Sequence, residues 1–385
     1  MREKVMHLAA DGQISWLQAA DMLGISARHM YRVRALWQTH GLSALMDQRG
    51  RVPRRARVKP ETVNALCALR RGRYRDFSVK HFYEHAGIEA TFGVSYSYLL
   101  RMLQDVDLAE KAEGKGRYFR KRDRKPMCGM MIHLDASRHA WLGPKAALWD
   151  LVVALDDADG QILYGRFVKE EDSLSCIAAL EHILRHKGRF KSLYTDRGSH
   201  FCTTSHQGQK PNLEQHTHIS RICEALGIKH MRAMSPQARG RSERAFGTIQ
   251  GRLPQELAFH GITDYPKANT YLTDVFIPEF NQRFSHEPDL SESAFVPLAE
   301  EQDLTLLMSV QHPRKVHNDN TVSFQNLTLQ IPPQGHRFGF AKCQVTVHQF
   351  TDGSLGISHL GVLLAKYTPK GGLLTDKNIN RFKAA

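Results

Sequence analysis

The order of the apolar segments between residues 127 and 300 constrains the fold of this chain more than any other feature. Three short apolar runs follow one another from Met130, and segments with a helical period then alternate with further runs. The turn signal Asp-Asp-Ala-Asp-Gly at 156–160 joins the second and third runs as a predicted hairpin. The predicted strands are 130–135, 149–155, 162–168, 192–195 and 228–231, and the predicted helices are 173–186, 219–226 and a long helix from Ser242. This pattern predicts an α/β domain whose sheet begins with three antiparallel strands.

Three carboxylates occupy positions where a side chain would face a cleft. Asp135 and Asp196 end the first and fourth apolar runs, and Glu243 lies in an Arg-rich stretch typical of the exposed start of a helix. Mg²⁺ binds a few such oxygen ligands together with water and substrate phosphate. Two ions about 3.5–4 Å apart can activate an attacking oxygen and stabilise the leaving oxygen of a phosphodiester. We therefore predict that these three acids are catalytic and hold two Mg²⁺ ions, with Mn²⁺ as a substitute.

The residues beside these acids suit a site that handles DNA. Gly198 would let the backbone turn tightly after Asp196, and His200 is near enough in sequence to contact DNA or the acidic centre. The arginines around Glu243 are predicted to hold substrate phosphates, and they are Arg239, Arg241 and Arg244.

Two other acidic clusters compete for the role of metal site. Asp156, Asp157 and Asp159 lie in the predicted hairpin turn, where we expect them to be solvated. Glu170–Asp172 is better explained as negative charge at the N-terminus of the following helix, where the helix dipole favours it. Neither cluster is predicted to bind metal.

The N-terminal residues 1–47 predict a helix-turn-helix. Ala20 is small where two helices would cross, Gly24 can take the positive φ of the turn, and Ser26 is a good N-cap for the second helix. The side chains left facing outward are those that a recognition helix offers to a major groove, namely Arg28, His29, Tyr31 and Arg32. The alternative is an ordinary helical hairpin with a solvated basic face.

Basic linkers separate the further predicted domains. Residues 48–59 hold six basic residues and a proline, and they are predicted to follow the phosphate backbone or enter a minor groove, unless they are a solvated spacer. The predicted DNA contacts in this linker are Arg51, Arg54 and Arg55. A second helical, helix-turn-helix-like DNA-binding domain is predicted at 60–108, and a second basic linker at 109–126.

The remaining chain is predicted to form two more domains, which makes the protein multidomain α+β. The α/β catalytic core covers 127–300. Short alternating strands with turns such as Asn318–Asn320 predict a small β-barrel at 310–370.

Charge and composition narrow the class of partner. A formal net charge of +14 and a pI near 9.6 favour a polyanionic partner, because contacts to phosphates release condensed counterions. Six cysteines without any Cys-x-x-Cys pair predict reduced, mostly buried thiols rather than disulfides or a zinc site. No apolar run is long enough to span a bilayer, and the N-terminus lacks a signal-peptide core. We therefore expect a cytoplasmic, nucleoid-associated protein that acts on DNA and does not bind membranes.

Several stretches of this chain match a known family. The most specific is Ser-Pro-Gln-Ala-Arg-Gly-Arg-Ser-Glu-Arg at 235–244, and Tyr-Thr-Asp-Arg-Gly at 194–198 and Ala-Ala-Asp-Met-Leu-Gly-Ile-Ser at 19–26 accompany it. With the three acids, they resemble bacterial insertion-sequence transposases with an Asp-Asp-Glu core, of the ISNCY type. More distantly, they resemble the phage Mu transposase and retroviral integrases. The spacing from Asp196 to Glu243 is longer than in that wider superfamily, and 205–216 resembles an inserted loop.

The resemblance implies a ribonuclease H-like core, in which the first and fourth strands are neighbours. Asp135 and Asp196 would then meet at adjacent strand ends, with Glu243 on a helix beside them. It also implies a transposase that binds element ends, cleaves DNA and joins 3′-hydroxyl ends to target DNA by two-metal-ion phosphoryl transfer. The expected partners are double-stranded DNA, as terminal inverted repeats and as target, and further copies of the chain in a homo-oligomer assembled on DNA.

Two other functions compete with this one. A non-enzymatic DNA-binding regulator derived from a transposase would need a broken acidic triad, and this triad is whole. A nuclease of the ribonuclease H or Holliday-junction class would leave the helical units and the basic linkers unexplained.

Overall fold

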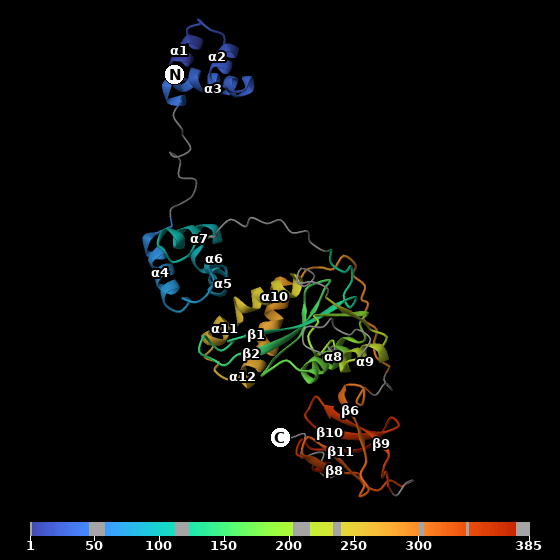
Figure 1. Cartoon of the computed structure of the whole chain (residues 1–385). Helices are drawn as coiled ribbons and strands as arrows, with labels where there is room; N and C mark the ends of the chain where they lie inside the picture. The colour runs from blue at the N-terminus through green and yellow to red at the C-terminus, as the bar shows by residue number, and fades with distance from the viewer. Residues whose placement is uncertain are drawn as a thin grey trace. The chain divides into compact units, whose positions relative to one another are not determined.

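Figure 1 shows the computed structural model of the chain, coloured from blue at the N-terminus to red at the C-terminus. The structure describes residues 2–45, 58–111, 123–202, 216–233, 240–299, 304–335 and 339–374. Contacts between Cα atoms divide the chain into two compact units. The first unit comprises Met1–Arg71 and Glu89–Leu108, and the second comprises Gly72–Ile88 and Ala109–Ala385.

The N-terminal helices of the first unit form the predicted helix-turn-helix. They are α1 (Arg2–Ala10), α2 (Trp16–Met22) and α3 (Ala27–His40), followed by a 3-10 turn, η1 (Gly41–Leu45). Ala20 is buried between α2 and its neighbours, together with Met30 of α3. Gly24 takes a φ of +62° in the turn, and the Ser26 hydroxyl accepts a hydrogen bond from the His29 backbone N–H at 3.3 Å. The turn and the cap read from the sequence are therefore confirmed.

The helices of the predicted domain 60–108 are divided between the two units. Helices α4 (Pro60–Arg71) and α7 (Tyr96–Asp105) belong to the first unit, whereas α5 (Val79–His85) belongs to the second. The short helix α6 (Ile88–Phe92) begins at the boundary. A DNA-binding role for this region stays a prediction.

A mixed five-stranded sheet forms the centre of the second unit. Its strand order is β3-β2-β1-β4-β5. Strands β1, β2 and β3 pair antiparallel, whereas β4 pairs parallel with β1 and β5 parallel with β4. The strands are β1 (Ile132–His139), β2 (Trp149–Asp156), β3 (Ile162–Val168), β4 (Ser192–Thr195) and β5 (Lys229–Arg232). Three antiparallel strands joined to two parallel ones in this order is the predicted ribonuclease H-like topology.

The two faces of this sheet carry separate apolar cores, because successive side chains of a strand point to opposite faces. Ile132 and Leu134 of β1 pack with helices α8 (Ser173–Lys187) and α9 (His218–Ala225). Leu151 and Val153 of β2 pack on the other face against the later helices. These are α10 (Gly240–Gln250), α11 (Leu253–Phe259), α12 (Tyr265–Tyr271), a π-helical turn η4 (Leu272–Phe276) and α13 (Ile277–Phe284).

The long helix predicted from Ser242 is shorter than expected. Helix α10 ends at Gln250, after which Gly251 and Arg252 form a turn. Pro254 stands in the first turn of α11, a position where its missing N–H costs no helical hydrogen bond. The apolar period continues across this break, and the glycine and proline interrupt the helix within it.

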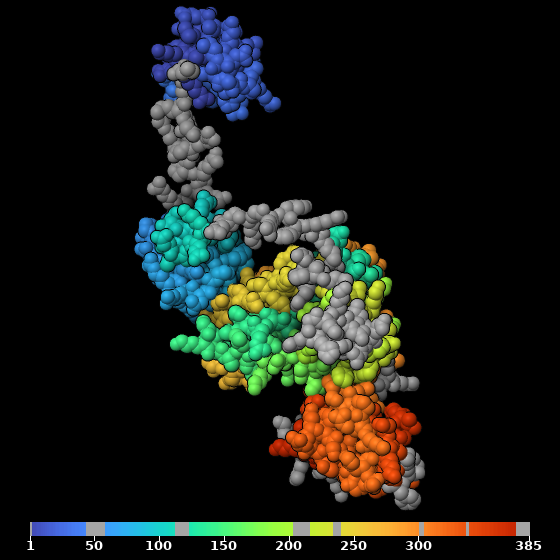
Figure 2. All heavy atoms as spheres, in the orientation of Figure 1, coloured from blue at the N-terminus to red at the C-terminus, as the bar shows by residue number. Residues whose placement is uncertain are grey.

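The C-terminal part of the second unit is all-β. Strands β6 (Ser309–Lys315), β9 (Gln344–Phe350), β10 (Leu355–His359), β11 (Val362–Tyr367) and β12 (Leu373–Leu374) form a sheet of order β12-β11-β10-β9-β6. Strands β7 (Thr321–Phe324) and β8 (Leu327–Gln330) form a hairpin. Apolar side chains of β7 to β11 share one core, whereas Val310 of β6 is buried in the core of the α/β sheet. Figure 2 shows the C-terminal part as one body of orange and red atoms. Closure of these strands into a barrel stays a prediction.

Across the residues that the structure describes, no helix has the length and apolar character needed to cross a membrane.

Candidate functional site

The register of the sheet brings two of the three acids to neighbouring positions. The prediction that a strand ends at Asp135 is wrong, because β1 continues to His139 and pairs Asp135 with Val153 of β2. Strands β1 and β4 pair Ile132 with Leu193 and His133 with Tyr194, so partners are 61 positions apart in the chain. Asp135 and Asp196 have the same separation, and Asp196 is the first residue after β4. Continued by two residues, the register therefore places Asp196 beside Asp135, across a strand spacing of about 4.8 Å.

Asp135 lies on the face of the sheet that α10 covers. It alternates with Ile132 and Leu134, which point into the opposite core. Its side chain lines a small cavity together with His133 and with Ser242 of α10. The residue is 8% exposed, and its Oδ1 accepts a hydrogen bond from the Ala136 backbone N–H at 3.0 Å. Asp135 is therefore a nearly buried carboxylate held on a rigid strand.

Asp196 is held by the turn that follows it. Its Oδ1 accepts a hydrogen bond from the Gly198 backbone N–H at 2.7 Å. A Cβ atom built on Gly198 would lie 3.0 Å from the same oxygen, so a larger residue would crowd the carboxylate. The half-buried His200 ring packs edge-on against the ring of Phe201, with centroids 6.3 Å apart. The Gly198 backbone thus binds Asp196, whereas the His200 ring packs against Phe201.

Glu243 stands in the first turn of α10 with an exposed side chain. Helix α10 packs on the sheet through Phe246 and Ile249, which are buried in the core that it shares with β2. Phe246 also lines the cavity beside Asp135. The oxygen atoms of the three acids do not all lie within 4.8 Å of one another, a distance that two other groups of ligand side chains in the described chain do meet. Glu243 is therefore on the same side of the sheet as Asp135 without closing on it.

The acidic turn after β2 is buried, which corrects the prediction that it is solvated. Asp156, Asp157 and Asp159 are 1%, 0% and 6% exposed. Asp156 accepts hydrogen bonds from the backbone N–H groups of Gly129 at 2.7 Å and Ala158 at 2.9 Å. Burial raises the pKa of Asp156 to about 6. The turn signal was correct, but segments distant in the sequence cover it.

Asp157 ties α10 to the sheet. His133 Nε2 of β1 is 2.7 Å from its Oδ1, and Arg241 Nη1 of α10 is 2.5 Å from the same atom. Arg241 also donates to the Asp157 backbone oxygen at 3.0 Å, and the Lys125 N–H donates to Oδ2 at 2.8 Å. Burial alone would raise the pKa of Asp157, but these partners outweigh it and hold the pKa well below its usual range.

This ion pair changes the interpretation of Arg241. Sequence reasoning placed its guanidinium on a substrate phosphate, whereas the structure gives it a buried carboxylate within the same domain. A guanidinium has five N–H donors, so a contact of Arg241 with a substrate phosphate stays a prediction beside the observed pair. Because Arg241 lies two residues before Glu243, its observed contact fixes the first turn of α10 and thereby the position of Glu243.

Glu171 is a fourth carboxyl group near the two aspartates, and sequence reasoning missed it. Its pKa is raised to about 7, chiefly by burial, with further contributions from the negative charges of Asp196, Asp135 and Asp150. The Cys176 thiol donates to its Oε1 at 3.4 Å. In the cluster predicted to serve the helix N-terminus, Asp172 does cap α8, accepting from the Ser175 N–H at 2.7 Å. Glu171 instead lies close enough to Asp135 and Asp196 for their negative charges to affect its pKa.

Some of the remaining predicted DNA contacts are exposed on helices, and the others lie outside the residues that the structure describes. On α3, Met30 is buried while the four side chains predicted to face DNA are exposed, namely Arg28, His29, Tyr31 and Arg32. On α10, Arg244 is exposed and its Nε donates to the Gly240 backbone oxygen at 3.1 Å. Four predicted contacts lie outside the described residues, namely Arg51, Arg54, Arg55 and Arg239.

Comparisons of sequence connect this chain to mobile elements. A family model described as winged helix-turn helix matches residues 4–63. The chain is 26% identical over 361 residues to y4bF, a proposed transposase of Sinorhizobium fredii, covering 94% of this chain and 78% of that protein. It is 34% identical over 235 residues to the transposase for insertion sequence IS1202 of Streptococcus pneumoniae, covering 61% of this chain and half of that protein. The chain is thus a relative of insertion-sequence transposases.

Comparisons of structure find retroviral integrases. A chain of the simian T-cell lymphotropic virus intasome, solved in complex with the PP2A regulatory subunit B56 gamma, matches with 16% identity and a TM-score of 0.35. The match covers 78% of this chain and all of that one. The HTLV-2 integrase catalytic core domain in complex with magnesium matches with 18% identity and a TM-score of 0.28, covering 37% of this chain and 82% of that one. The fold described above rests on its own strand order and not on these superpositions.

Proposed function

We propose that this protein is a DNA transposase that binds the ends of its element, cleaves the DNA and joins 3′-hydroxyl ends to target DNA. The observation that carries the proposal is the register of β1 and β4, which, continued by two residues, leads Asp135 and Asp196 to neighbouring positions. The kinship with insertion-sequence transposases supports the same substrate. In this proposal Asp135, Asp196 and Glu243 are the catalytic acids.

The donor atoms of these acids fit two magnesium ions, with manganese as a substitute. All three residues offer carboxylate oxygens, which a hard cation prefers. The raised pKa of Glu171 is partly caused by Asp135 and Asp196, a sign of the concentrated negative charge that bound cations would neutralise. When bound, two Mg²⁺ ions would supply an activated oxygen nucleophile and stabilise the leaving oxygen of the phosphodiester.

The chain's own residues would orient this chemistry. Asp135 is fixed on a buried strand, and Asp196 is fixed by the Gly198 amide. Glu243 is carried by a helix whose first turn the pair of Arg241 with Asp157 fastens to the sheet. Phosphoryl transfer needs mainly positioning and charge neutralisation, so rigid placement of these acids is the main task of the protein.

DNA would be recognised through the first unit. The exposed face of α3 would enter the major groove, with Arg28 and Arg32 among the side chains that reach base edges. Basic residues of the linkers would follow the phosphate backbone and make the affinity dependent on salt. Because two element ends must be joined together, we also propose a homo-oligomer assembled on DNA, and a small β-barrel as the form of the C-terminal strands.

The test is a set of substitutions that remove charge and preserve shape. Asp135→Asn, Asp196→Asn and Glu243→Gln should each lower strand transfer by at least about 10²–10³-fold, the loss typical when one preorganised electrostatic group is removed. Binding of element-end DNA should stay within about twofold, well inside the 1.4 kcal/mol of a tenfold change. Asp289→Asn, at an exposed acid elsewhere in the second unit, is the matched control and should join DNA normally. Normal joining by any of the three variants would exclude that acid from the site.

A further inference from the structure

Helix α5 contacts a later part of the second unit, α11, which follows it in the chain by more than a hundred residues. The segment Gly72–Ile88 belongs to the second unit, and α5 contacts the region of α11. Glu84 of α5 pairs with Arg252 at 2.6 Å and with Arg283 at 3.0 Å. The His85 ring stands edge-on to the Phe259 ring, with centroids 4.5 Å apart. This contact brings three potential metal ligands together.

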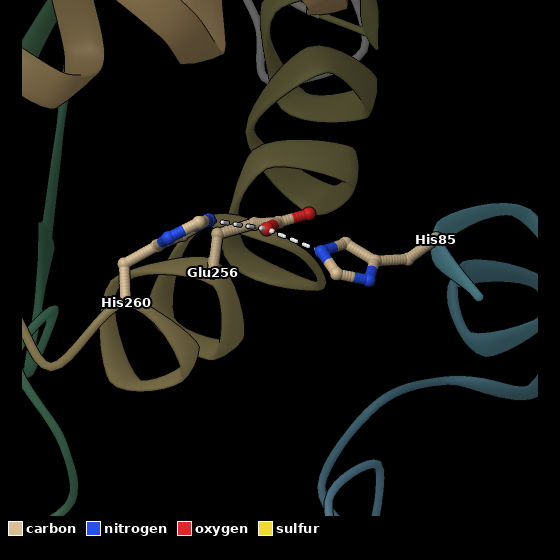
Figure 3. Close-up of side chains that lie close together, drawn as sticks. All are labelled: His85, Glu256 and His260. Atoms are coloured by element: carbon tan, nitrogen blue, oxygen red, sulfur yellow. Dashed lines mark ion pairs between the residues drawn. The ribbon is translucent and has the colours of Figure 1, made fainter.

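These ligands are His85 of α5, Glu256 of α11 and His260, the residue that caps α11 (Figure 3). His85 Nε2 is 3.2 Å from Glu256 Oε2, and His260 Nε2 is 4.0 Å from the same oxygen. All three ligand atoms lie within 4.8 Å of one another. Bonds of about 2.0–2.2 Å in a tetrahedral zinc site place donors roughly 3.3–3.5 Å apart. Side-chain rotations that move the ligand atoms by about 1 Å would therefore let all three atoms bind one ion.

The ligands already have outer partners of the kind that orient metal-binding side chains. His81 Nε2 is 2.6 Å from the second carboxylate oxygen of Glu256, Oε1. The Tyr271 hydroxyl donates to Oε2 at 3.4 Å. On the other side of the cluster, the Tyr74 hydroxyl is 3.4 Å from His85 Nδ1, which leaves Nε2 directed at Glu256.

The exposure of the three side chains also suits a metal. The His85 and Glu256 side chains are 21% and 10% exposed, whereas His260 is 46% exposed. The site is thus enclosed by protein at His85 and Glu256 and exposed to solvent at His260.

We propose that His85, Glu256 and His260 form a zinc site that fastens α5 to α11. Two imidazole nitrogens and one carboxylate suit zinc and related transition metals, whereas magnesium prefers oxygen ligands alone. The zinc site shares no residue with the proposed catalytic acids Asp135, Asp196 and Glu243, and its existence does not depend on the activity proposed for them. Because its ligands come from two segments far apart in the chain, bound zinc would contribute directly to the stability of their contact.

The experiment measures zinc binding to the full-length protein in excess Mg²⁺, which occupies any oxygen-only sites. Equilibrium dialysis with elemental analysis gives the affinity, and Co²⁺ in place of zinc gives a visible absorption spectrum that reports nitrogen ligands. His260→Gln and His85→Gln should each lower zinc affinity by at least about 100-fold, since loss of even an outer partner costs about 10–100-fold. Tyr271→Phe, which removes one outer hydroxyl and keeps the ring, should cost about 10-fold.

His186→Gln is the matched control. Like His260, His186 is an exposed histidine four residues from another possible ligand, which is His182 on the same helix, α8. The two rings stack with centroids 4.1 Å apart. This variant should bind zinc as the wild type does. Zinc should raise the Tm of the wild type and not that of His260→Gln. Unchanged zinc affinity in His260→Gln and His85→Gln, or its loss in His186→Gln instead, would overturn the proposal.

Discussion

Replacing Arg241 by methionine should destabilise the sheet domain, although the residue stands two positions from Glu243. Its guanidinium pairs with the fully buried carboxylate of Asp157. Removing one partner of a buried ion pair leaves an uncompensated charge and costs about 3–5 kcal/mol. His133 and the Lys125 N–H still bind Asp157, and Arg241 itself is 14% exposed. We therefore expect a loss of about 3 kcal/mol, the lower end of that range.

Arg244→Met is the matched control for this substitution. Arg244 lies three residues further along α10, is exposed, and its Nε donates to the Gly240 backbone oxygen of its own helix. Its loss should change the free energy of unfolding by no more than about 0.5 kcal/mol. Urea unfolding of both full-length variants measures the difference. Equal stability of the two variants would refute the assignment of Arg241 to a buried pair.

The same two variants separate a structural arginine from one that contacts DNA. Each B-DNA phosphate contact contributes about 0.9 to the slope of log affinity against log salt, because counterions are released. Arg244→Met should reduce the slope by about 0.9 if this side chain holds one phosphate, whereas Arg241→Met should leave it unchanged. A folded Arg241→Met protein with a slope reduced by that amount would show that Arg241 contacts a DNA phosphate as well as Asp157.

Two further substitutions test the surroundings of the acids. Gly198→Ala would place a Cβ atom 3.0 Å from Asp196 Oδ1, so strand transfer should fall while DNA affinity is retained. Gly247→Ala is the control and should keep full activity, because no atom lies within 4 Å of the Cβ position at Gly247. Equal activity of the two variants would show that Gly198 has no role in placing Asp196. The pKa of Glu171 is raised from 4.5 to about 7, so the folded protein holds a proton that the unfolded chain releases, and stability should fall as pH rises between these values. Glu171→Gln should flatten this decline in urea unfolding without divalent cations, and parallel pH profiles for the two proteins would contradict the raised pKa.

The sequence predicted the strands because a hydrophobic period is a local pattern. Residues 162–168 and 192–195 have the apolar character of buried strands, and both strands have these bounds in the structure. Asp196 directly follows the second of these strands, as predicted. The predicted end at Asp135 is wrong, because β1 continues to His139 in pairing with β2, which the polar residues after Asp135 did not indicate.

Features that depend on covering by distant residues could not be predicted. The sequence Asp-Asp-Ala-Asp-Gly predicts a turn whether the turn is solvated or buried. Asp157 is bound by the Lys125 N–H and by Arg241, which lie 32 and 84 positions away in the chain. The proximity of Glu171 to Asp135 and Asp196 likewise depends on the path of the chain after β3. The contact of His85 with Glu256 joins positions 171 residues apart, and neither has a neighbour in sequence that suggests the other.

The docking of α5 bears on how this protein can be cut into parts. A fragment that begins at residue 127 would lack His81 and Glu84, although these side chains neutralise groups on the later helices. Glu256, whose side chain is 10% exposed, would lose its 2.6 Å partner His81, and Arg252 would lose its carboxylate. Truncation after the second basic linker, which the sequence offers as a natural boundary, would thus expose unpaired charges and aromatic surface. Two fragments made by dividing the chain between residues 111 and 123 should associate, because the N-terminal fragment still carries α5.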